Sequence, residues 1–485
     1  MASLEEIRNA RLQKLKLLQE AGVSAYPISA RPDYTIAEAI DNFTKLSGKK
    51  TITLAGRVMA LRPQGGLIFF NLDDGTAKFQ GLLKQEEIDA TAFDLFSKTV
   101  DIGDFVEAIG TLFLTKRQEK TIQVKSWRML SKSLLPLPEK WHGLQDVEER
   151  FRKRYLDTIM SGDVKKRFLT RSQIISEIRK ILDKEGFVEV ETPMLQSLAG
   201  GASAEPFTTR HNALDIDLFL RIAPELYLKE LLVGGFPKVY EIGRNFRNEG
   251  IDVTHNPEFT MLEYYQSFSD ASRQRVFVEK LVKGVVKKIT GGSEFSYNGT
   301  PINLGTKFAV ISYFDLLQRY AHITHPEKET LESIRTHAQR VGVKFDMKDT
   351  LEKIIDNIYK KAVRPKIVQP TFVIDYPVNF LPLAKRSEKN PNVVDAFQLL
   401  IGGLEVVKAF SELNDPIDQR ERFAAQEKTG DREAQVTNEE YLEAMEHGMP
   451  PAGGVGIGID RLVMLLTDSK NIREVILFPT LRPKN

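Results

Sequence analysis

The sequence predicts an α+β protein, in which a small N-terminal β-barrel precedes a larger domain of antiparallel strands and flanking helices. Five short runs of strand-forming residues fall between residues 51 and 132. Farther along, residues 247–265 alternate like a pair of strands, and residues 453–466 read as a strand that leads into a helix. With 485 residues, of which 42% are hydrophobic, the chain is long enough for two or three domains.

The composition excludes several classes of protein. The chain has no cysteine, which rules out disulfides, thiolate zinc sites and a cysteine nucleophile. No apolar run approaches the ~20 residues of a membrane span and the N-terminus lacks a signal-peptide pattern, so we expect a cytoplasmic protein without membrane contact. With 68 basic and 66 acidic residues the net charge is only +2, so any contact with RNA must come from local basic faces and from stacking.

The first element is predicted to be a helix over residues 2–21. Ser3 and Glu6 have the spacing of a capping box at its start. Leucine and isoleucine give the helix one apolar side, and lysine and arginine occupy much of the rest. A solvated polar face is the favoured interpretation of the basic side, and a face that contacts RNA is the second.

The β-rich region that follows fits an OB-fold barrel. Its strand candidates are residues 52–59, 67–72, 78–83, 104–114 and 121–129, separated by turns rich in glycine and aspartate. Phe69, Phe79 and Gln80, with Arg62 close by, would share an exposed surface. Such a surface reads single strands by stacking bases on aromatic rings and by hydrogen bonds from polar side chains. For Phe79, a place in the core is slightly favoured.

The chain is therefore divided into an N-terminal helix and barrel domain (1–135), a linker (136–155) and a larger domain (156–485). Four helical stretches are predicted in the larger domain, at residues 170–184, 270–290, 327–362 and 418–446. The third of these is charged and has no catalytic-looking cluster, so it is interpreted as a surface insertion between strands.

The stretch from Arg247 to Tyr265 carries the densest set of functional side chains. Arg247 and Glu249 are two residues apart and would share one face of a strand. A tight loop containing His255 follows. The next strand presents alternate residues on one face: Phe259, Met261, Glu263 and Tyr265. This face would suit a phosphate, an aromatic base and an ammonium together, whereas a solvated hairpin with ordinary surface charges is the alternative.

A glycine-rich strand near the C-terminus is the second informative segment. Gly454, Gly456 and Gly458 would lie on one face and leave a flat floor where a ligand approaches the backbone. Arg461 would lie near the start of the following helix, next to this floor. Such a turn also marks close packing, and the chain has neither a Walker-type nor a dinucleotide-binding glycine motif.

Six segments of the chain match one protein family, in that family's order. Residues 187–194, 240–265 and 453–461 match its three class motifs. Residues 200–203, 223–229 and 410–415 match its specificity signatures. By these segments the chain resembles the class II lysyl-tRNA synthetases of the bacterial type, and the match covers almost its whole length.

This resemblance implies a class II synthetase antiparallel sheet with flanking helices, preceded by an OB-fold that binds the anticodon. The implied reaction is the ATP-dependent ligation of L-lysine to tRNA(Lys) through a lysyl-adenylate, with Mg²⁺ as cofactor. The implied assembly is a homodimer with Pro193 at the interface. The implied anticodon-binding residues are Arg62, Phe69 and Gln80.

The resemblance also assigns residues to ATP. Arg247 would bridge the α-phosphate and the lysine carboxylate, and Arg247 and Arg461 are the implied catalytic residues. Phe259 and Arg461 would enclose the adenine, Glu249 would face its exocyclic amine, and His255 would face the β- or γ-phosphate. Outside this motif, His255 would be interpreted as a loop histidine bonded to backbone. The whole implied ATP site is Arg247, Glu249, His255, Phe259, Glu405, Gly458 and Arg461.

Lysine recognition needs carboxylates at both ends of the substrate, because a buried ammonium is costly unless it is paired. By resemblance, Glu263, Tyr265 and Glu412 bind the ε-ammonium, while Glu225 and the backbone at Gly201 bind the α-ammonium. At the start of a helix, Glu225 would also complement the helix dipole. The remaining implied lysine-binding residues are Arg247, Phe410 and Gly456.

Two residues depart from the family pattern near its metal site. Glu405 matches a metal-binding glutamate, but the second such position is Gln398, and Lys408 stands where asparagine is common. Together these changes add two positive charges, the charge of one Mg²⁺. We hypothesise that Lys408 substitutes for one metal ion near the phosphates or the lysine carboxylate. Because 405 and 408 differ by three on a strand, a shared face requires a bulge or a twist; otherwise Lys408 would pair with a surface carboxylate.

Three other functions compete with this interpretation. Aspartyl or asparaginyl enzymes of the same subgroup need a cationic or amide-reading pocket, which Glu263 and Glu412 contradict. A paralogue that lysylates a protein resembles the catalytic half only, which the barrel region contradicts. A non-enzymatic RNA-binding or regulatory protein would not need the intact set of Arg247, Glu249, Phe259 and Arg461.

Overall fold

The computed structural model describes residues 3–48, 50–138, 144, 146–428 and 436–484. The chain forms two compact units, residues 1–144 and 145–485. The predicted linker, 136–155, lies partly outside the described residues, at 139–143 and 145. Its described part includes helix α5 (Val147–Arg152), which belongs to the second unit.

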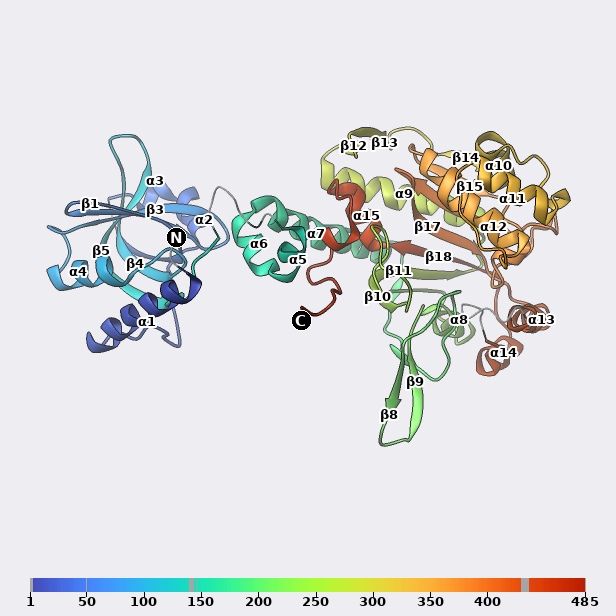
Figure 1. Cartoon of the computed structure of the whole chain (residues 1–485), viewed down its shortest axis with the longest axis horizontal. Coiled ribbons are helices and arrows are strands. Elements are labelled where there is room, and N and C mark those ends of the chain that lie inside the picture. Colours follow the sequence, from blue (N-terminus) through green and yellow to red (C-terminus); the bar gives the residue numbers. More distant parts are fainter. Residues whose placement is uncertain (1–2, 49, 139–143, 145, 429–435, 485) are drawn as a thin grey trace. The chain divides into compact units, whose positions relative to one another are not determined.

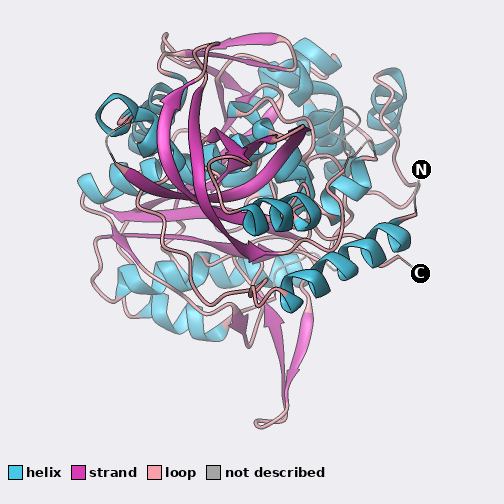
Figure 2. Ribbon diagram, turned by 90° about the vertical axis from the view of Figure 1, so that its left-hand side faces the viewer, coloured by secondary structure: helices cyan, strands magenta, loops and turns pink. Residues whose placement is uncertain are grey.

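The first unit is built around a closed five-stranded barrel (Figures 1 and 2). Its strands are β1 (Thr51–Gln64), β2 (Leu67–Asp73), β3 (Lys78–Lys84), β4 (Phe105–Leu114) and β5 (Lys120–Ser131), in the order β1-β2-β3-β5-β4. All five predicted strands are therefore present. The predicted N-terminal helix is α1 (Leu4–Glu20), and Ser3 and Glu6 form the predicted capping box. The other helices of this unit are α2 (Ile36–Asp41), α3 (Phe43–Leu46) and α4 (Ala90–Thr99).

The second unit contains an eight-stranded sheet in the order β14-β15-β16-β17-β18-β11-β10-β6. Its pairs are antiparallel except β14–β15 and β6–β10, which are parallel. The strands are β6 (Val188–Glu189), β10 (Lys238–Phe246), β11 (Glu258–Ser267), β14 (Ala309–Ser312), β15 (Thr371–Ile374), β16 (Ala396–Ile401), β17 (Leu404–Ser411) and β18 (Ala452–Gly458). Smaller sheets are formed by β7 (Leu195–Gln196), β8 (Thr208–His211) and β9 (Ile216–Leu220), and by β12 (Glu294–Tyr297) and β13 (Thr300–Asn303).

Two hydrophobic cores cover the two faces of this sheet. On one face, Tyr264 and Val455 pack against helices α7 (Gly162–Lys184), α9 (Ala271–Thr290) and α15 (Ile459–Leu466). On the other face, Tyr265 and Phe410 belong to a core to which six other helices contribute, and Figure 1 shows several of these beside β14 and β15. They are α8 (Glu225–Val233), α10 (Tyr313–Ala321), α11 (Leu331–Arg340), α12 (Leu351–Ile358), α13 (Pro416–Glu427) and α14 (Glu439–Glu446). The second face also holds the polar side chains of the candidate site.

The connection between β10 and β11 differs from the prediction. β10 ends at Phe246, so Arg247 and Glu249 do not lie on a strand, and the connection runs from residue 247 to 257 instead of forming a tight loop. The Arg247 amide still donates to the Pro257 carbonyl (2.9 Å), but the next amide, of Asn248, donates to the distant Glu205 carbonyl (2.7 Å) and not to the partner strand. The alternation from Phe259 to Tyr265 is present on β11 as predicted.

Candidate active site

The strand register aligns one row of residues across the sheet. The row runs Glu241, Glu263, Gly456, Lys408 and Gln398, each directly opposite the next. A second row, two residues along, contains Tyr265, Gly454 and Phe410. Directly opposite residues share a face, as do residues two apart on one strand. The functional residues that the sequence predicted on β11, β17 and β18 therefore lie on one face of the sheet.

The glycines of β18 make room for the side chains of neighbouring strands. A Cβ atom at Gly454 would lie 2.0 Å from Glu412 Oε1 and 2.4 Å from Tyr265 Cε1, closer than any real contact. At Gly458 the nearest atom would be 3.7 Å away, an ordinary contact. A side chain at position 454 would therefore collide with neighbouring residues of the protein, whereas the backbone at Gly458 is accessible to a ligand.

Three carboxylates and one ammonium are buried together beside these glycines. Lys229 Nζ lies 2.6 Å from Glu225 Oε1 and 2.5 Å from Glu412 Oε2. Lys229 is fully buried, Glu412 is 1% exposed and Glu263 is 5% exposed. Burial lowers the pKa of Lys229, but the charges of Glu225 and Glu412 outweigh it and raise this pKa above its usual value. The group therefore has more negative than positive charge when ionised.

Glu263 differs from Glu225 and Glu412 in having no ion pair with Lys229. The Tyr265 hydroxyl donates to its Oε2 (3.1 Å). Burial, and then the nearby charge of Glu225, raise the pKa of Glu263 to about 8, although Arg247 acts in the opposite direction. Burial also raises the pKa of Glu412, and Lys229 offsets part of this rise. An ammonium ligand would favour the charged form of both carboxylates.

The backbone at Gly201 closes one side of the same pocket. Gly201 has φ +85°, and a Cβ there would lie 2.8 Å from Glu225 Cβ. The predicted lysine-binding residues thus lie together: Gly201, Glu225, Glu263, Tyr265, Phe410, Glu412 and Gly456. The sequence reasoning did not give Lys229 a role. Its spacing of four from Glu225 on α8 was the available signal.

A second group of residues lies where β11, β17 and α15 meet. The Arg247 guanidinium lies over the Phe259 ring, 5.1 Å from its centroid. Arg461 Nη1 donates to the Glu405 carbonyl (3.0 Å), and Arg461 Nη2 lies 3.1 Å from His255 Nε2. Because a guanidinium only donates, His255 Nε2 accepts, and His255 Nδ1 is left to donate to Asp252 (2.9 Å). The structure therefore joins His255 to Arg461, while Glu249 is exposed in the connection after β10.

Glu405 and Lys408 share a face because β17 contains a bulge. Leu399 opposes Val407 while Leu400 opposes Glu405, so Val406 is an extra residue in β17. The Glu405 carboxylate forms an ion pair with Arg364 (Arg364 Nη1 to Glu405 Oε2, 3.1 Å). In the described residues there is no cluster of three or more His, Asp or Glu side chains arranged to hold a metal ion.

Part of the nucleic-acid-binding surface that the sequence predicted is present on the barrel. Arg62 and Phe69 are direct cross-strand neighbours, and Arg62 Nη2 donates to Gln80 Oε1 (3.4 Å). Gln80 is further held by Thr121, to whose Oγ1 it donates (2.9 Å). Phe69 is half-buried, whereas Phe79 is 3% exposed and belongs to the barrel core, the favoured interpretation for that residue.

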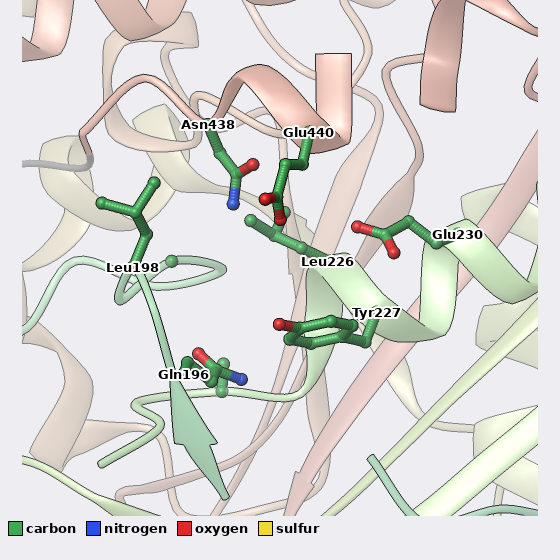
Figure 3. Close-up of a pocket in the computed structure, with 9 residues that line it drawn as sticks. Gln196, Leu198, Leu226, Tyr227, Glu230, Asn438 and Glu440 are labelled. Atoms are coloured by element: carbon green, nitrogen blue, oxygen red, sulfur yellow. The ribbon is translucent and has the colours of Figure 1, made fainter. Parts of the chain in front are cut away.

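Two further features lie near the site without belonging to it. A small hollow beside Gly200 is bordered by Tyr227 and Glu230 of α8 and by Glu440 of α14 (Figure 3). None of the predicted substrate ligands lines this hollow. Pro193 is exposed, in a segment that also exposes Met194 and Leu195.

Among the described residues, no helix is long and apolar enough to cross a membrane.

Comparison with known proteins gives two family matches. Residues 146–482 match the class II tRNA synthetases (D, K and N), and residues 52–130 match the OB-fold nucleic acid binding domain. The chain is 48% identical over 485 residues to a lysine–tRNA ligase of Carboxydothermus hydrogenoformans, covering 99% of both chains. It is 46% identical to the lysine–tRNA ligases of Pelotomaculum thermopropionicum and Moorella thermoacetica, covering 99% of this chain and 96% and 98% of theirs.

Proposed function

The chain belongs to the lysine–tRNA ligases of the class II tRNA synthetase family, and on that premise we propose that it joins L-lysine to tRNA(Lys) in two steps, through a lysyl-adenylate. In the first step a lysine carboxylate oxygen attacks the α-phosphorus of ATP, and pyrophosphate leaves. In the second step the lysyl group moves to the tRNA. Neither step needs a nucleophile from the protein, so the protein contributes by positioning and by charge.

The observation that carries the proposal is the excess of carboxylates in the buried pocket. Lys229 is paired with Glu225 and Glu412, whereas Glu263 forms no ion pair within 4 Å in the described residues, so the pocket suits a ligand with its own ammonium groups. We assign Glu263, Tyr265 and Glu412 to the ε-ammonium of lysine. Glu225 and the Gly201 backbone would take the α-ammonium, and Phe410 and Gly456 would line the aliphatic stem. Aspartate or asparagine has no second ammonium, so either substrate would leave Glu263 and Glu412 without the substrate cation that lysine provides.

The cationic group beside this pocket would bind ATP. Arg247 would bridge the lysine carboxylate and the α-phosphate, since a guanidinium matches both in planar, bidentate geometry. Its position over the Phe259 ring supports a role for Phe259 beneath the adenine, with Arg461 on the other side and Gly458 as the open floor. His255, held by Asp252 and Arg461, would meet the terminal phosphates. Glu249, which is exposed in the connection after β10, would face the exocyclic amine of the adenine.

One carboxylate is available for the Mg²⁺ that we assign to this reaction. Glu405 would hold the ion together with phosphate oxygens, the arrangement that Mg²⁺ prefers at nucleotide sites. When bound, Mg²⁺ would neutralise charge that develops on the phosphates.

The remaining assignments concern RNA and assembly. We assign anticodon binding to Arg62, Phe69 and Gln80, and the barrel domain, the linker and the catalytic domain to residues 1–135, 136–155 and 156–485. The exposed apolar side chains next to Pro193 support an interface between two copies of the chain. We also assign the enzyme to the cytoplasm, where its substrates are found.

Amino-acid-dependent exchange of pyrophosphate into ATP tests the proposed function. We expect exchange with lysine and none above background with the other nineteen amino acids, aspartate and asparagine included. Exchange with another amino acid would contradict the assignment of the pocket. Exchange with none would mean that the chain has lost adenylation.

A further inference from the structure

The bulge in β17 creates an arrangement that a regular strand could not have. In a regular strand, residues three apart point to opposite faces, so Glu405 and Lys408 would be separated by the sheet. The extra residue Val406 places both side chains on the face of Gly456 and Glu263. The Lys408 side chain therefore lies within the candidate site, not on the opposite surface.

Lys408 also lies between the two halves of that site. Its direct neighbour on one side is Gly456, beyond which lies Glu263 of the ammonium pocket. Electrostatically it interacts with Glu405, Glu225 and Arg247. Its side chain is exposed to solvent, and Lys408 forms no ion pair within 4 Å in the described part of the chain. Its ammonium is therefore available to a ligand.

The charges around Lys408 form an unbalanced cationic group. Arg364, Arg461, Lys408 and Lys360 all lower the pKa of Glu405, against the effect of its burial. Lys360 is itself paired with Asp356 (2.7 Å), so Arg364, Arg461 and Lys408 remain as the cations that act on Glu405, and Arg247 adds a further cation near Lys408. An excess of this size needs a ligand with several negative charges, and a triphosphate next to a carboxylate would provide them.

The residue opposite Lys408 does not supply a second metal ligand. Gln398 is uncharged, and its Oε1 already accepts hydrogen bonds from Tyr376 OH (2.8 Å) and Tyr359 OH (3.4 Å). Glu405 is already paired with Arg364 (3.1 Å), and the Asp356 carboxylate is paired with Lys360 (2.7 Å). Oxygen-seeking divalent cations prefer several anionic or carbonyl oxygens. The residues present therefore fit one Mg²⁺ and do not fit a second.

We propose that Lys408 binds the anionic groups where the lysine carboxylate meets the α-phosphate, and that its fixed ammonium takes the place of a second divalent cation. This inference rests on the proposed function. As the carboxylate oxygen bonds to the α-phosphorus, the bond to the β-phosphate breaks and pyrophosphate leaves with its electron pair. Lys408 keeps its proton throughout and acts only as a point charge with three donors.

Pyrophosphate exchange with wild-type protein comes first, because a chain without lysine-dependent exchange would refute the proposed function and not the role of Lys408. The variants are Lys408→Met and Lys408→Arg. The control is Lys288→Met, at an exposed position on helix α9, which covers the opposite face of the sheet. We expect kcat/KM for lysine to fall about 100-fold in Lys408→Met, the usual size for loss of one charge-stabilising group. Lys408→Arg should retain most of the activity, and the control should match wild type.

The number of bound metal ions gives a readout independent of activity. Mn²⁺ would be titrated by electron paramagnetic resonance into protein that holds lysine and a non-hydrolysable ATP analogue. We expect one Mn²⁺ per active site in the wild type, and two in the double variant Lys408→Asn with Gln398→Glu. Two or more ions in the wild type would overturn the inference, as would wild-type kcat/KM in a folded Lys408→Met protein.

Discussion

Lys229 Nζ lies 2.5 Å from Glu412 Oε2, and both side chains are removed from solvent. The same ammonium also contacts Glu225. The Lys229 ammonium therefore offsets the desolvation cost of the two carboxylates it contacts. An isolated charge would be far more costly to bury. Lys229 does not neutralise every carboxylate of the pocket, since Glu263 has no cation of its own at this distance among the described residues. The protein's own cation thus stabilises the carboxylates of the pocket in part, and the pocket still favours a cationic ligand.

We expect Glu412→Gln to impair lysine activation strongly. The change removes a counter-charge from a desolvated ammonium, which costs about 2–5 kcal/mol, or at least about 30-fold in kcat/KM for lysine. Lysine-dependent pyrophosphate exchange measures this loss. Glu443→Gln, at an exposed position on α14, is the matched control and should behave as wild type. Unchanged lysine activation in Glu412→Gln would reject the assignment of Glu412.

Lysine binding should become tighter as pH rises toward 8. Because the pKa of Glu263 is raised to about 8, the free protein holds a proton on this carboxylate at neutral pH. An ammonium ligand favours the charged carboxylate, so binding releases the proton, and affinity rises by up to about tenfold per pH unit below the pKa. The charged groups that act on Glu263 are Glu225, Glu412, Arg247 and Arg221.

Calorimetric titration with lysine between pH 6 and 7.5, in the absence of ATP, measures this slope. Both amines of lysine stay largely protonated in that range, so the protein determines the change. Glu263→Gln should bind lysine more weakly and with a shallower slope. An affinity that does not vary with pH in the wild type would contradict a raised pKa at Glu263.

The local patterns of the sequence predicted much of this fold. Alternation along β11 placed Glu263 and Tyr265 on one face, and spaced glycines identified the strand β18. The capping box of α1 and the five barrel strands were also readable, because each depends on residues close together in the sequence.

Features set by distant contacts were not predictable in this way. After Arg247 the pairing of β10 with β11 ends, and the Asn248 amide bonds to Glu205, a residue more than forty positions earlier in the chain. The bulge at Val406 has no glycine or proline to mark it, and the sequence showed only that a shared face for Glu405 and Lys408 required one. Lys229 forms two ion pairs. The pair with Glu225 is indicated by their spacing of four residues on a helix, whereas the pair with Glu412 depends on the fold.

We expect Phe69→Ala to weaken tRNA aminoacylation and to leave lysine-dependent pyrophosphate exchange unchanged. Phe69 is half-buried beside Arg62, in a compact unit separate from the adenylation site. Loss of one base stack costs about 1–3 kcal/mol of RNA binding. Phe105→Ala removes an equally half-buried ring from another strand of the same barrel, where it packs under Arg57, and is the matched control. If both activities fall together, or neither changes, Phe69 is not a stacking platform.

Two glycines on β18 should respond differently to the same added methyl group. In Gly454→Ala the new Cβ would lie 2.0 Å from Glu412 Oε1 and 2.4 Å from Tyr265 Cε1, so both side chains must move. Displacing them separates Glu412 from Lys229 and overpacks the pocket, which costs about 1–3 kcal/mol of folding free energy. We therefore expect a lower melting temperature and no measurable lysine binding.

In Gly458→Ala the nearest atom to the new Cβ is 3.7 Å away, so the protein should fold as stably as wild type and bind lysine normally in the absence of ATP. The methyl group instead occupies the surface that we assign to ATP, so KM for ATP in the exchange reaction should rise. Melting curves, ATP-free lysine calorimetry and ATP titrations separate the two effects. If both variants lost lysine binding equally, the pocket would not depend on the close contact at Gly454, and the steric argument for that glycine would fail.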